Sequence, residues 1–413
     1  MNWTKAAIYT VVLAIVGPFL VDHLYPAWLM IVNHPKLLPE ISEFEDYKIK
    51  FADQIRNCED VVLDEKRGTA ILSCDPGRDK WNTVMGTFID PSWSGALWYY
   101  NYPKFAFHEE GAIHRMEISG MDPEAWMKFH PLGIGYWSSN RTLYVANHSP
   151  LGPTIEVFKV NKQVTCVVHE RTISHDLLNT PNSIIPISDH EIYITNDHKW
   201  EVKEHRQMAT LETYLSFPGG SVVYMNLHTN ETFKVASLPF ANGIAVINGT
   251  VLAVASTTTP SVNIYAIDLE TKNITRTQKI SVPFWVDNLS VDSNGILLIA
   301  GHPWAPAVTK VSKTNHLYQL GEGQEEGLPM EQRPKAPSWV AEWDGNAKGE
   351  LRNLYVGKEY GTSTTAVRDV GRNIGIVVGL YEKGIMLFKS KPRLAKKNGQ
   401  RGLWPSGKES VFD

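Results

Sequence analysis

The sequence is poor in cysteine, carries no excess of positive charge and lacks long segments with helical periodicity. Three cysteines among 413 residues exclude a fold held together mainly by disulfides. A formal net charge of −4 at pH 7 argues against nucleic acid as a partner. Without segments of 3.6-residue period, parallel strands joined by helices are not expected. The composition therefore favours an all-β protein, long enough for one large β domain or two ordinary ones.

The N-terminus carries the clearest targeting signal. An uncharged apolar run at residues 6–21 is short for a membrane span and long for the core of a signal peptide. No A-x-A-like cleavage site follows clearly, so residues 1–32 are predicted to be a signal anchor or transmembrane helix. A cleaved signal peptide and a buried helix are the alternatives. An anchor or a cleaved signal would send the remainder into the secretory pathway, either tethered to the membrane or secreted.

Sequons and cysteines agree with an oxidising compartment. Several Asn-x-Ser/Thr triplets occur, and those at Asn230, Asn248 and Asn273 lie in polar, turn-like stretches and are predicted glycosylation sites. Cys58 and Cys74 flank a predicted hairpin and are expected to form one disulfide. The alternative is that all three cysteines are small buried thiols.

Short alternating strands separated by turn signals fill residues 57–388. Several stretches repeat an apolar strand, a polar turn and a second apolar strand, as in GIAVINGTVLAVAS (243–256). Starts near residues 59, 133, 183, 244, 289 and 365 give six units. A repeat of this kind is typical of the blades of a β-propeller. We therefore predict an all-β, six-bladed β-propeller. A linker and helical lead-in would precede it at 33–56, and a basic, disordered tail would follow at 389–413.

An acid or an amide stands just before the first strand of several units. These residues are Glu59, Asp60, Asn182, Asn242, Asp287 and Asn288. In a propeller, equivalent positions of successive blades face the central channel together, so their oxygens would converge. An all-oxygen site suits Ca²⁺, which takes six to eight such ligands in loose geometry. The alternative is that each residue only satisfies its own turn.

Six motifs resemble the serum paraoxonase/arylesterase family. In chain order they are EDVVL (59–63), ANHSPLGPTIEVF (146–158), YITNDH (193–198), PFANGI (239–244), VDNLSVD (286–292) and GHP (301–303). The resemblance covers about residues 57–388. It implies a six-bladed propeller with two calcium ions in its tunnel, hydrolysis of lactones and aryl esters, and a retained hydrophobic N-terminus.

The resemblance also implies the ligands of both ions. The catalytic ion would be held by Glu59, Asn182, Asn242, Asp287 and Asn288. A structural ion would take Asp60, the backbone carbonyl of Ile134 and Ser183, where Ser183 replaces an aspartate of the family and weakens that site. His148 matches the second histidine of the family's pair, and His302 matches the histidine of its HP motif.

Two departures from the family pattern bear on catalysis and closure. Leu132 occupies the position of the family's proposed base, and His130 lies two residues upstream. Glu59, Asp287, or His148 acting through a water, are the catalytic candidates that replace it. The disulfide that joins the family's first and last strands has no counterpart, so closure would depend on packing or, locally, on a Cys58–Cys74 bond.

Three functions are compatible with these residues. The first is a calcium-dependent hydrolase of small apolar lactones or aryl esters, in which Ca²⁺ polarises the carbonyl and stabilises the oxyanion. The second is a sugar-lactonase or strictosidine-synthase-like enzyme of the same architecture. The third is a non-catalytic luminal or membrane-tethered binding propeller, which the leucine at position 132 and the serine at position 183 favour. The membrane would be contacted through the N-terminal helix.

Overall fold

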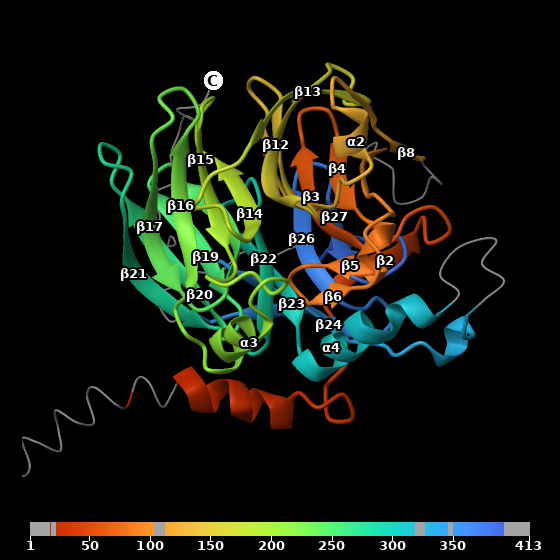
Figure 1. Ribbon diagram of the computed structural model, residues 1–413. Coiled ribbons are helices and arrows are strands. Elements are labelled where there is room, and N and C mark those ends of the chain that lie inside the picture. Colours follow the sequence, from red (N-terminus) through yellow and green to blue (C-terminus); the bar gives the residue numbers. More distant parts are fainter. Residues whose placement is uncertain (1–16, 18–21, 103–111, 319–326, 346–349, 392–413) are drawn as a thin grey trace, which may run out of the picture.

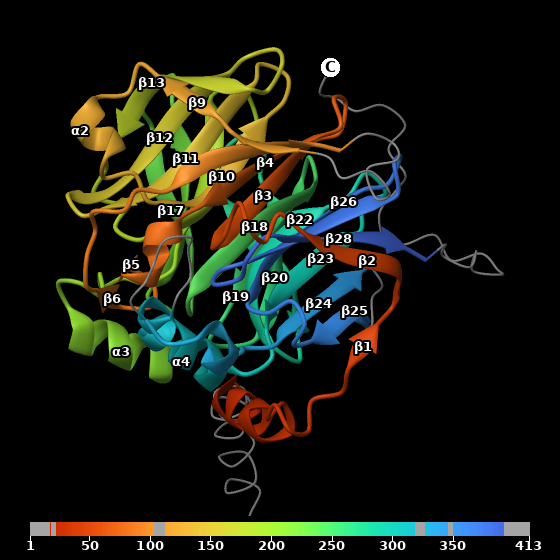
Figure 2. The same ribbon diagram turned by 90° about the vertical axis from the view of Figure 1, so that its right-hand side faces the viewer.

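The fold is a six-bladed β-propeller, as the sequence predicts. The computed structural model describes residues 17, 22–102, 112–318, 327–345 and 350–391. Six sheets of four or five strands radiate from a common axis, and a two-stranded sheet lies outside them (Figures 1 and 2). The six innermost strands begin at Cys58, Pro131, Pro181, Ala241, Trp285 and Ser363. Each beginning lies within four residues of the start predicted from the repeats.

Blades 1 to 3 follow one another along the chain. Blade 1 contains β3 (Cys58–Asp64), β4 (Thr69–Cys74), β7 (Ala96–Asn101) and β8 (Ile113–Arg115). Blade 2 contains β10 (Pro131–Trp137), β11 (Thr142–Ser149), β12 (Gly152–Val160), β13 (Cys166–Ile173) and β9 (Glu117–Ser119). Blade 3 contains β14 (Pro181–Pro186), β15 (Glu191–Asn196), β16 (Gly220–Asn226) and β17 (Thr232–Leu238).

Blades 4 to 6 continue in the same direction, and the last two each receive a strand from the N-terminal region. Blade 4 contains β18 (Ala241–Asn248), β19 (Val251–Ser256), β20 (Ser261–Ile267) and β21 (Ile274–Ser281). Blade 5 contains β22 (Trp285–Val291), β23 (Leu297–His302), β24 (Ser338–Trp343), β25 (Arg352–Gly357) and β1 (Ile41–Ser42). Blade 6 contains β26 (Ser363–Asp369), β27 (Ile374–Gly379), β28 (Ile385–Ser390) and β2 (Phe44–Lys50).

The core lies between the blades. Six clusters of buried apolar side chains each join one pair of neighbouring sheets, so that Val61 of blade 1, for example, belongs to the same cluster as Ile376 of blade 6. Strands with alternating or continuous apolar residues suit this arrangement because each inner sheet is covered on both faces.

The ring is closed by strands that the sequence interpretation placed in a linker. Residues 33–56 were predicted to be a linker and helical lead-in, but they contain β1 and β2. Strand β2 pairs antiparallel with β28, with Tyr47 opposite Phe388, and the ring of Phe44 stacks on Phe388 at 4.1 Å between centroids. The prediction of a helical lead-in is therefore wrong. Among the described residues, β2 pairs in a sheet only with β28, which comes from the far end of the chain, so no local strand partner marks it as a strand.

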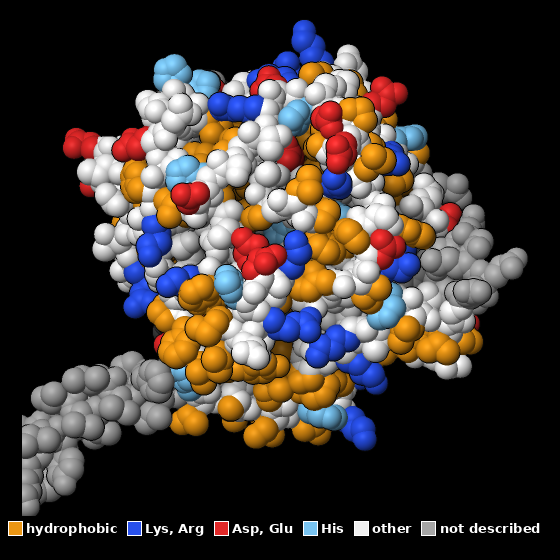
Figure 3. Space-filling view, viewed as in Figure 1, with side chains coloured by type: hydrophobic (Ala, Val, Ile, Leu, Met, Phe, Trp, Pro, Cys, Tyr) orange, Lys and Arg blue, Asp and Glu red, His pale blue; other side chains and the backbone are white. Residues whose placement is uncertain are grey.

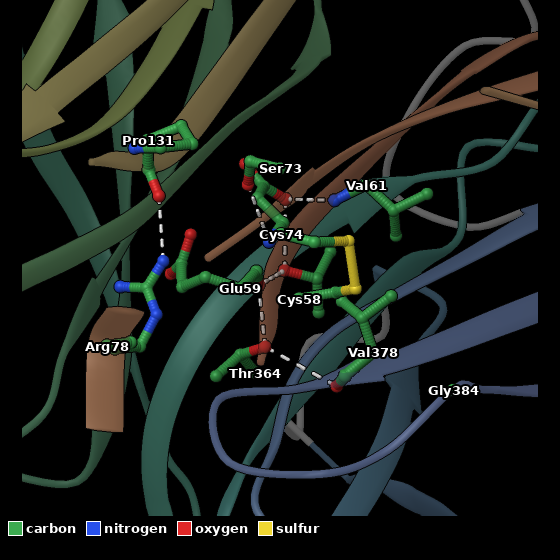
Figure 4. The surroundings of a disulfide bond; sticks show 12 residues. Cys58, Glu59, Val61, Ser73, Cys74, Arg78, Pro131, Thr364, Val378 and Gly384 are labelled. Atoms are coloured by element: carbon green, nitrogen blue, oxygen red, sulfur yellow. Dashed lines mark hydrogen bonds between the residues drawn. A yellow bond between two sulfur atoms is a disulfide. The ribbon is translucent and has the colours of Figure 1, made fainter. Parts of the chain in front are cut away.

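A disulfide joins Cys58 to Cys74 across the hairpin of β3 and β4, with 3.8 Å between the two Cα atoms. It ties the inner strand of blade 1 to its neighbour beside Glu59 (Figure 4). The third cysteine, Cys166, is half-buried and not part of a disulfide.

Three helical segments cover one end of the propeller. They are residues 22–32, α3 (Arg206–Tyr214) and α4 (Ala305–Thr314), all drawn below the blades in Figure 1. The shorter elements are η1 (Pro76–Asp79), β5 (Trp81–Asn82), β6 (Thr87–Phe88), α2 (Pro123–Trp126), η2 (Asn315–Leu317) and η3 (Met330–Gln332). No helix within the described residues is long and apolar enough to cross a membrane. The predicted run at 6–21 lies outside the described residues except for Gly17. Of the predicted tail, residues 389 and 390 belong to β28, and residues 392–413 lie outside the described part.

Candidate functional site

The candidate site lies at β-bulges near the beginnings of the six innermost strands. These strands, β3, β10, β14, β18, β22 and β26, contact one another in a closed ring. Each has a register break near its beginning: Cys58/Asp60, Pro131/Ile134, Pro181/Ile184, Ala241/Ile244, Val286/Leu289 and Ser363/Thr365. A β-bulge re-aims the side chains it contains. This explains why an acid and an amide, Asp287 and Asn288, interrupt the apolar strand of blade 5.

A cavity of about 690 Å³ connects these bulges with the helical end of the molecule. Its polar inner lining comes from Glu59, Asn182, Asn242, Asp287 and His302. The remainder is mainly apolar, and the outer lining includes residues of the 22–32 segment, α3 and α4. The volume and the mixture of apolar walls with a few polar groups are those of a small-molecule site.

Four of the predicted ligands carry a buried oxygen that accepts no hydrogen bond from the described part of the chain. These atoms are Glu59 Oε2, Asn182 Oδ1, Asn242 Oδ1 and Asn288 Oδ1. Buried acceptors are nearly always satisfied, and one left alone costs roughly 1–3 kcal/mol. Four such oxygens from blades 1, 3, 4 and 5 therefore form a donor set that suits a hard cation.

The side-chain nitrogens of the three asparagines all donate hydrogen bonds to the protein. Asn182 Nδ2 donates to Asp197 Oδ2 at 3.3 Å, and Asn242 Nδ2 donates to Thr257 Oγ1 at 3.0 Å. Asn288 Nδ2 donates to Glu59 Oε1 at 2.8 Å. Each amide is thus turned with its nitrogen bonded to the protein and its oxygen left over, which is the orientation that a cation ligand requires.

Burial and neighbouring carboxylates disfavour the ionised form of Glu59. Burial, and then the charges of Asp60 and Asp287, raise the pKa of Glu59 well above its ordinary value, while Arg78 and the Asn288 amide act in the opposite direction. Figure 4 shows the buried Arg78 side chain approaching Glu59, with its Nη2 donating to the carbonyl of Pro131 at 2.7 Å. A bound cation would relieve the repulsion between the carboxylates.

Amide oxygens are essential to any metal site at this position. Within the described ranges, no group of three or more His, Cys, Asp or Glu side chains is placed to hold a metal. A cation would therefore depend on the asparagine oxygens as much as on Glu59 and Asp287, and such a mixed oxygen shell favours Ca²⁺ over transition metals.

The residues predicted for a second ion lie together but are already bonded. Asp60, Ile134 and Ser183 line a separate cavity of about 260 Å³, which Asn288 also borders. Asp60 accepts hydrogen bonds from the backbone nitrogens of Val61 and Ile134, both at 2.8 Å, and from Thr365 Oγ1 at 3.0 Å. Both oxygens of Asp60 are thus satisfied by the protein, in contrast to the oxygens of the first set.

His302 and Asp287 form a pair at the cavity wall. His302 Nε2 lies 2.9 Å from Asp287 Oδ2, and His302 Nδ1 is buried without a partner among the described residues. If Nε2 carries the proton that Asp287 accepts, Nδ1 is the unprotonated nitrogen of the ring.

The other histidines of the sequence interpretation are engaged elsewhere. His148 lines a different, smaller cavity; its Nε2 contacts the carbonyl of Pro181 at 2.6 Å, its Nδ1 contacts Thr83 Oγ1, and burial lowers its pKa. His130 is bonded to Asp75 and to the carbonyl of Pro91. The geometry therefore favours His302 over His148 as a proton acceptor.

Sequence reasoning assigned no role to Asp197 or Thr257, which orient two of the amides. Asp197 stands at the exit of β15 within the YITNDH motif, so an acid directly after a predicted inner strand was the available signal. Thr257 follows β19 at the corresponding place, but a lone threonine there has no distinguishing pattern.

Comparison with known proteins gives concordant matches. Residues 91–316 match the family described as Arylesterase. The chain is 31% identical over 227 residues to serum paraoxonase/lactonase 3 of Oryctolagus cuniculus, covering 51% of this chain and 62% of that protein. It is 31% identical over 215 residues to serum paraoxonase/arylesterase 2 of Bos taurus, covering 48% and 59%. The matches thus span about three fifths of the length of these relatives.

A solved structure agrees with the fold. A gluconolactonase from Xanthomonas campestris superposes with a TM-score of 0.51 at 15% identity, covering 86% of this chain and 93% of that one. At this identity the likeness supports the propeller architecture alone.

Proposed function

Because the chain belongs to the Arylesterase family, we propose that it is a calcium-dependent hydrolase of small apolar lactones or aryl esters. The observation that carries the proposal is the set of four buried oxygens, from four blades, that accept no hydrogen bond within the described part of the chain. Three of their side chains, Glu59, Asn182 and Asn242, line the inner end of an apolar-walled cavity, and the fourth, Asn288, is bonded to Glu59. Glu59, Asn182, Asn242, Asp287 and Asn288 would hold the ion. When bound, Ca²⁺ would supply a Lewis acid that stabilises negative charge on the carbonyl oxygen of the substrate.

The chain itself would provide orientation and proton transfer. Leu132, Val84, Met85 and Trp285 line the cavity and would hold the apolar part of the substrate while excluding water. Asp287 would keep His302 in the tautomer whose Nδ1 accepts a proton from the attacking water. When the tetrahedral intermediate collapses and its C–O bond breaks, the same proton would pass to the leaving oxygen.

The direct test is hydrolysis of phenyl acetate and of a long-chain lactone by wild-type protein and by Asp287→Ala, each with calcium and with a chelator. Turnover that needs both calcium and Asp287 is expected. Full activity of Asp287→Ala would contradict the mechanism. Calcium-dependent thermal stability without turnover would instead favour a binding propeller, which the leucine at position 132 makes the relevant alternative.

A membrane-facing location is the second part of the proposal. Apolar side chains are exposed beside the cavity mouth, among them Leu24 (63%), Trp28 (53%) and Ile31 (69%) on the N-terminal segment and Tyr214 (78%) on α3. Figure 3 shows hydrophobic side chains gathered on this lower side of the molecule. Such a patch supports contact with a membrane surface through the N-terminal helix. Co-sedimentation with lipid vesicles tests it, and loss of binding in Trp28→Ser is expected.

A luminal or secreted location would also allow glycosylation. Asn230 and Asn273 are exposed, and Asn248 is half-buried at a turn. Accessible sequons of this kind support modification in the secretory pathway. A shift in gel mobility after treatment with an N-glycosidase would test this, and an unchanged mobility would argue against it.

A further inference from the structure

A chain of hydrogen-bonded side chains connects the candidate cation site with the helix at the cavity mouth. Asn182 Nδ2 donates to Asp197 Oδ2 at 3.3 Å. Asp197 Oδ1 lies 2.6 Å from His198 Nδ1, and His198 Nε2 lies 2.7 Å from Thr213 Oγ1. Asn182, Asp197 and His198 are buried, and Thr213 belongs to α3 and lines the cavity. The series of hydrogen bonds therefore runs from the inner strand β14 to helix α3 at the cavity wall.

Asp197 is the acceptor at the centre of this series of hydrogen bonds. An aspartate carboxylate only accepts, so Asp197 takes one hydrogen from the Asn182 amide and one from His198 Nδ1. Its presence fixes which end of the Asn182 amide points inward. Without an acceptor at this place, the amide nitrogen could turn toward the cation position and present positive rather than negative charge there.

Helix α3 is attached to the same strand exit by a second set of bonds. The backbone nitrogens of Lys199 and Trp200 donate to the carboxylate of Glu212, with the shortest distance 2.9 Å from Lys199. Residues 198–200 are thus held between Asp197 on one side and α3 on the other. A displacement of α3 would pull on His198, and a displacement of Asn182 would be felt at Thr213.

We infer that Asp197 and His198 are positioning residues that keep the Asn182 carbonyl oxygen directed at the cation and couple its binding to the order of α3. The inference rests on the proposed function only in taking the bound ion to be Ca²⁺. Bonds behind the ligands of a metal commonly govern its affinity about tenfold to a hundredfold. Coupling between two sites is reciprocal, so calcium must stabilise α3 to the same extent that an ordered α3 strengthens calcium binding.

Two threonines of α3 provide a matched test. Thr213 Oγ1 and Thr210 Oγ1 both donate back to a helix carbonyl, at 2.9 and 2.7 Å, but only Thr213 also contacts His198. Calcium binding to the metal-free full chain is measured by titration calorimetry for Thr213→Val and Thr210→Val. We expect about fivefold weaker binding for Thr213→Val and an unchanged affinity for Thr210→Val.

Hydrogen exchange supplies the second readout. In the wild type, calcium should slow exchange of the amides at 206–214, and in Thr213→Val this protection should fall to a small fraction. Asp197→Asn, which keeps size but removes the obligate acceptor, should bind calcium about tenfold more weakly while its melting temperature in chelator stays close to that of the wild type.

The outcomes separate the two proposals. Equal calcium affinity and equal protection in Thr213→Val and Thr210→Val would overturn the inference even in an active hydrolase. The expected affinity differences in a protein without esterase or lactonase turnover would uphold the inference and remove the proposed function. Absence of calcium binding to the wild type would overturn both.

Discussion

Replacing Asn242 by leucine is predicted to stabilise the calcium-free protein and to destabilise the protein in calcium, relative to the wild type. Asn242 is 4% exposed and its Oδ1 has no donor among the described residues. Leucine has a similar shape and no polar atoms. The substitution therefore removes a buried acceptor that is unfavourable without a cation, and it removes a ligand when the cation is present.

The magnitude follows from the bonds at this position. Removing an unsatisfied buried acceptor is worth about 1–3 kcal/mol. The Asn242 amide also donates to Thr257 Oγ1 at 3.0 Å, and losing that bond costs about 1 kcal/mol. Thr257 keeps its own bond to the carbonyl of Val286 at 2.7 Å, so no new donor is stranded. The net gain in chelator is about 1 kcal/mol. Calcium at a hundred times its dissociation constant would add about 2.7 kcal/mol to the wild type and nothing to the variant.

The assay is urea unfolding of both proteins in chelator and in saturating calcium. Asn315→Leu is the matched control, because Asn315 is equally buried but its amide donates to Asp79 at 2.6 Å and its oxygen accepts from Arg333 at 2.7 Å. The control should be less stable than the wild type in both conditions and keep the full calcium increment. If Asn242→Leu lowers stability in chelator, or keeps the calcium increment, the interpretation of the donorless oxygens is wrong.

Three further predictions concern the catalytic histidine, the pH dependence of stability and the disulfide. His302→Gln should lower kcat for phenyl acetate by at least about 100-fold in saturating calcium, whereas His148→Gln should keep most activity because His148 lies outside the main cavity. In chelator, burial raises the pKa of Asp60 to about 6 and that of Glu59 well above its ordinary value. The folded state then binds more protons than the unfolded state, so stability should fall as pH rises from about 4 to about 6, and a flat urea midpoint over that range would contradict this. Cys58→Ser should cost about 3 kcal/mol of unfolding free energy, as expected for a loop with 16 residues of separation, and equal midpoints for variant and wild type would show that the bond contributes nothing.

The propeller was predictable because its signals are local. Each inner hairpin places an apolar strand, a polar turn and another apolar strand within about fifteen residues, and this pattern recurs at blade spacing. Closure was not predictable in the same way. The sequence FEDYKIK of β2 contains four charged residues in seven, and only Phe44 of the strand is fully buried. Its identity as a strand depends on β28, which lies more than three hundred residues later.

The residues of the candidate site were predictable from the sequence, but their hydrogen bonds were not. Recurrence of Glu59, Asn182, Asn242 and Asp287 at one phase of the repeat indicated that they face the axis, and they line one cavity. The sequence did not indicate which oxygens would be left without donors, because that depends on partners in other segments, such as Thr257 and Asp197. The choice between His148 and His302 also depended on their bonds rather than on their place in a motif.

Blades 2 and 6 contribute no carboxylate or amide side chain to the predicted ligand set. All six inner strands break register near the axis, but the bulge of blade 2 presents Leu132, and that of blade 6 presents Thr364, whose hydroxyl donates to the carbonyl of Glu59 at 2.6 Å. The polar shell therefore comes from blades 1, 3, 4 and 5, with an apolar side chain set into it at blade 2. In the proposed function, an ester bound with its apolar group against Leu132 would direct its carbonyl oxygen toward the cation that these side chains hold. A proton acceptor is then needed from a wall other than blade 2, and His302 at the end of the second strand of blade 5 occupies such a position.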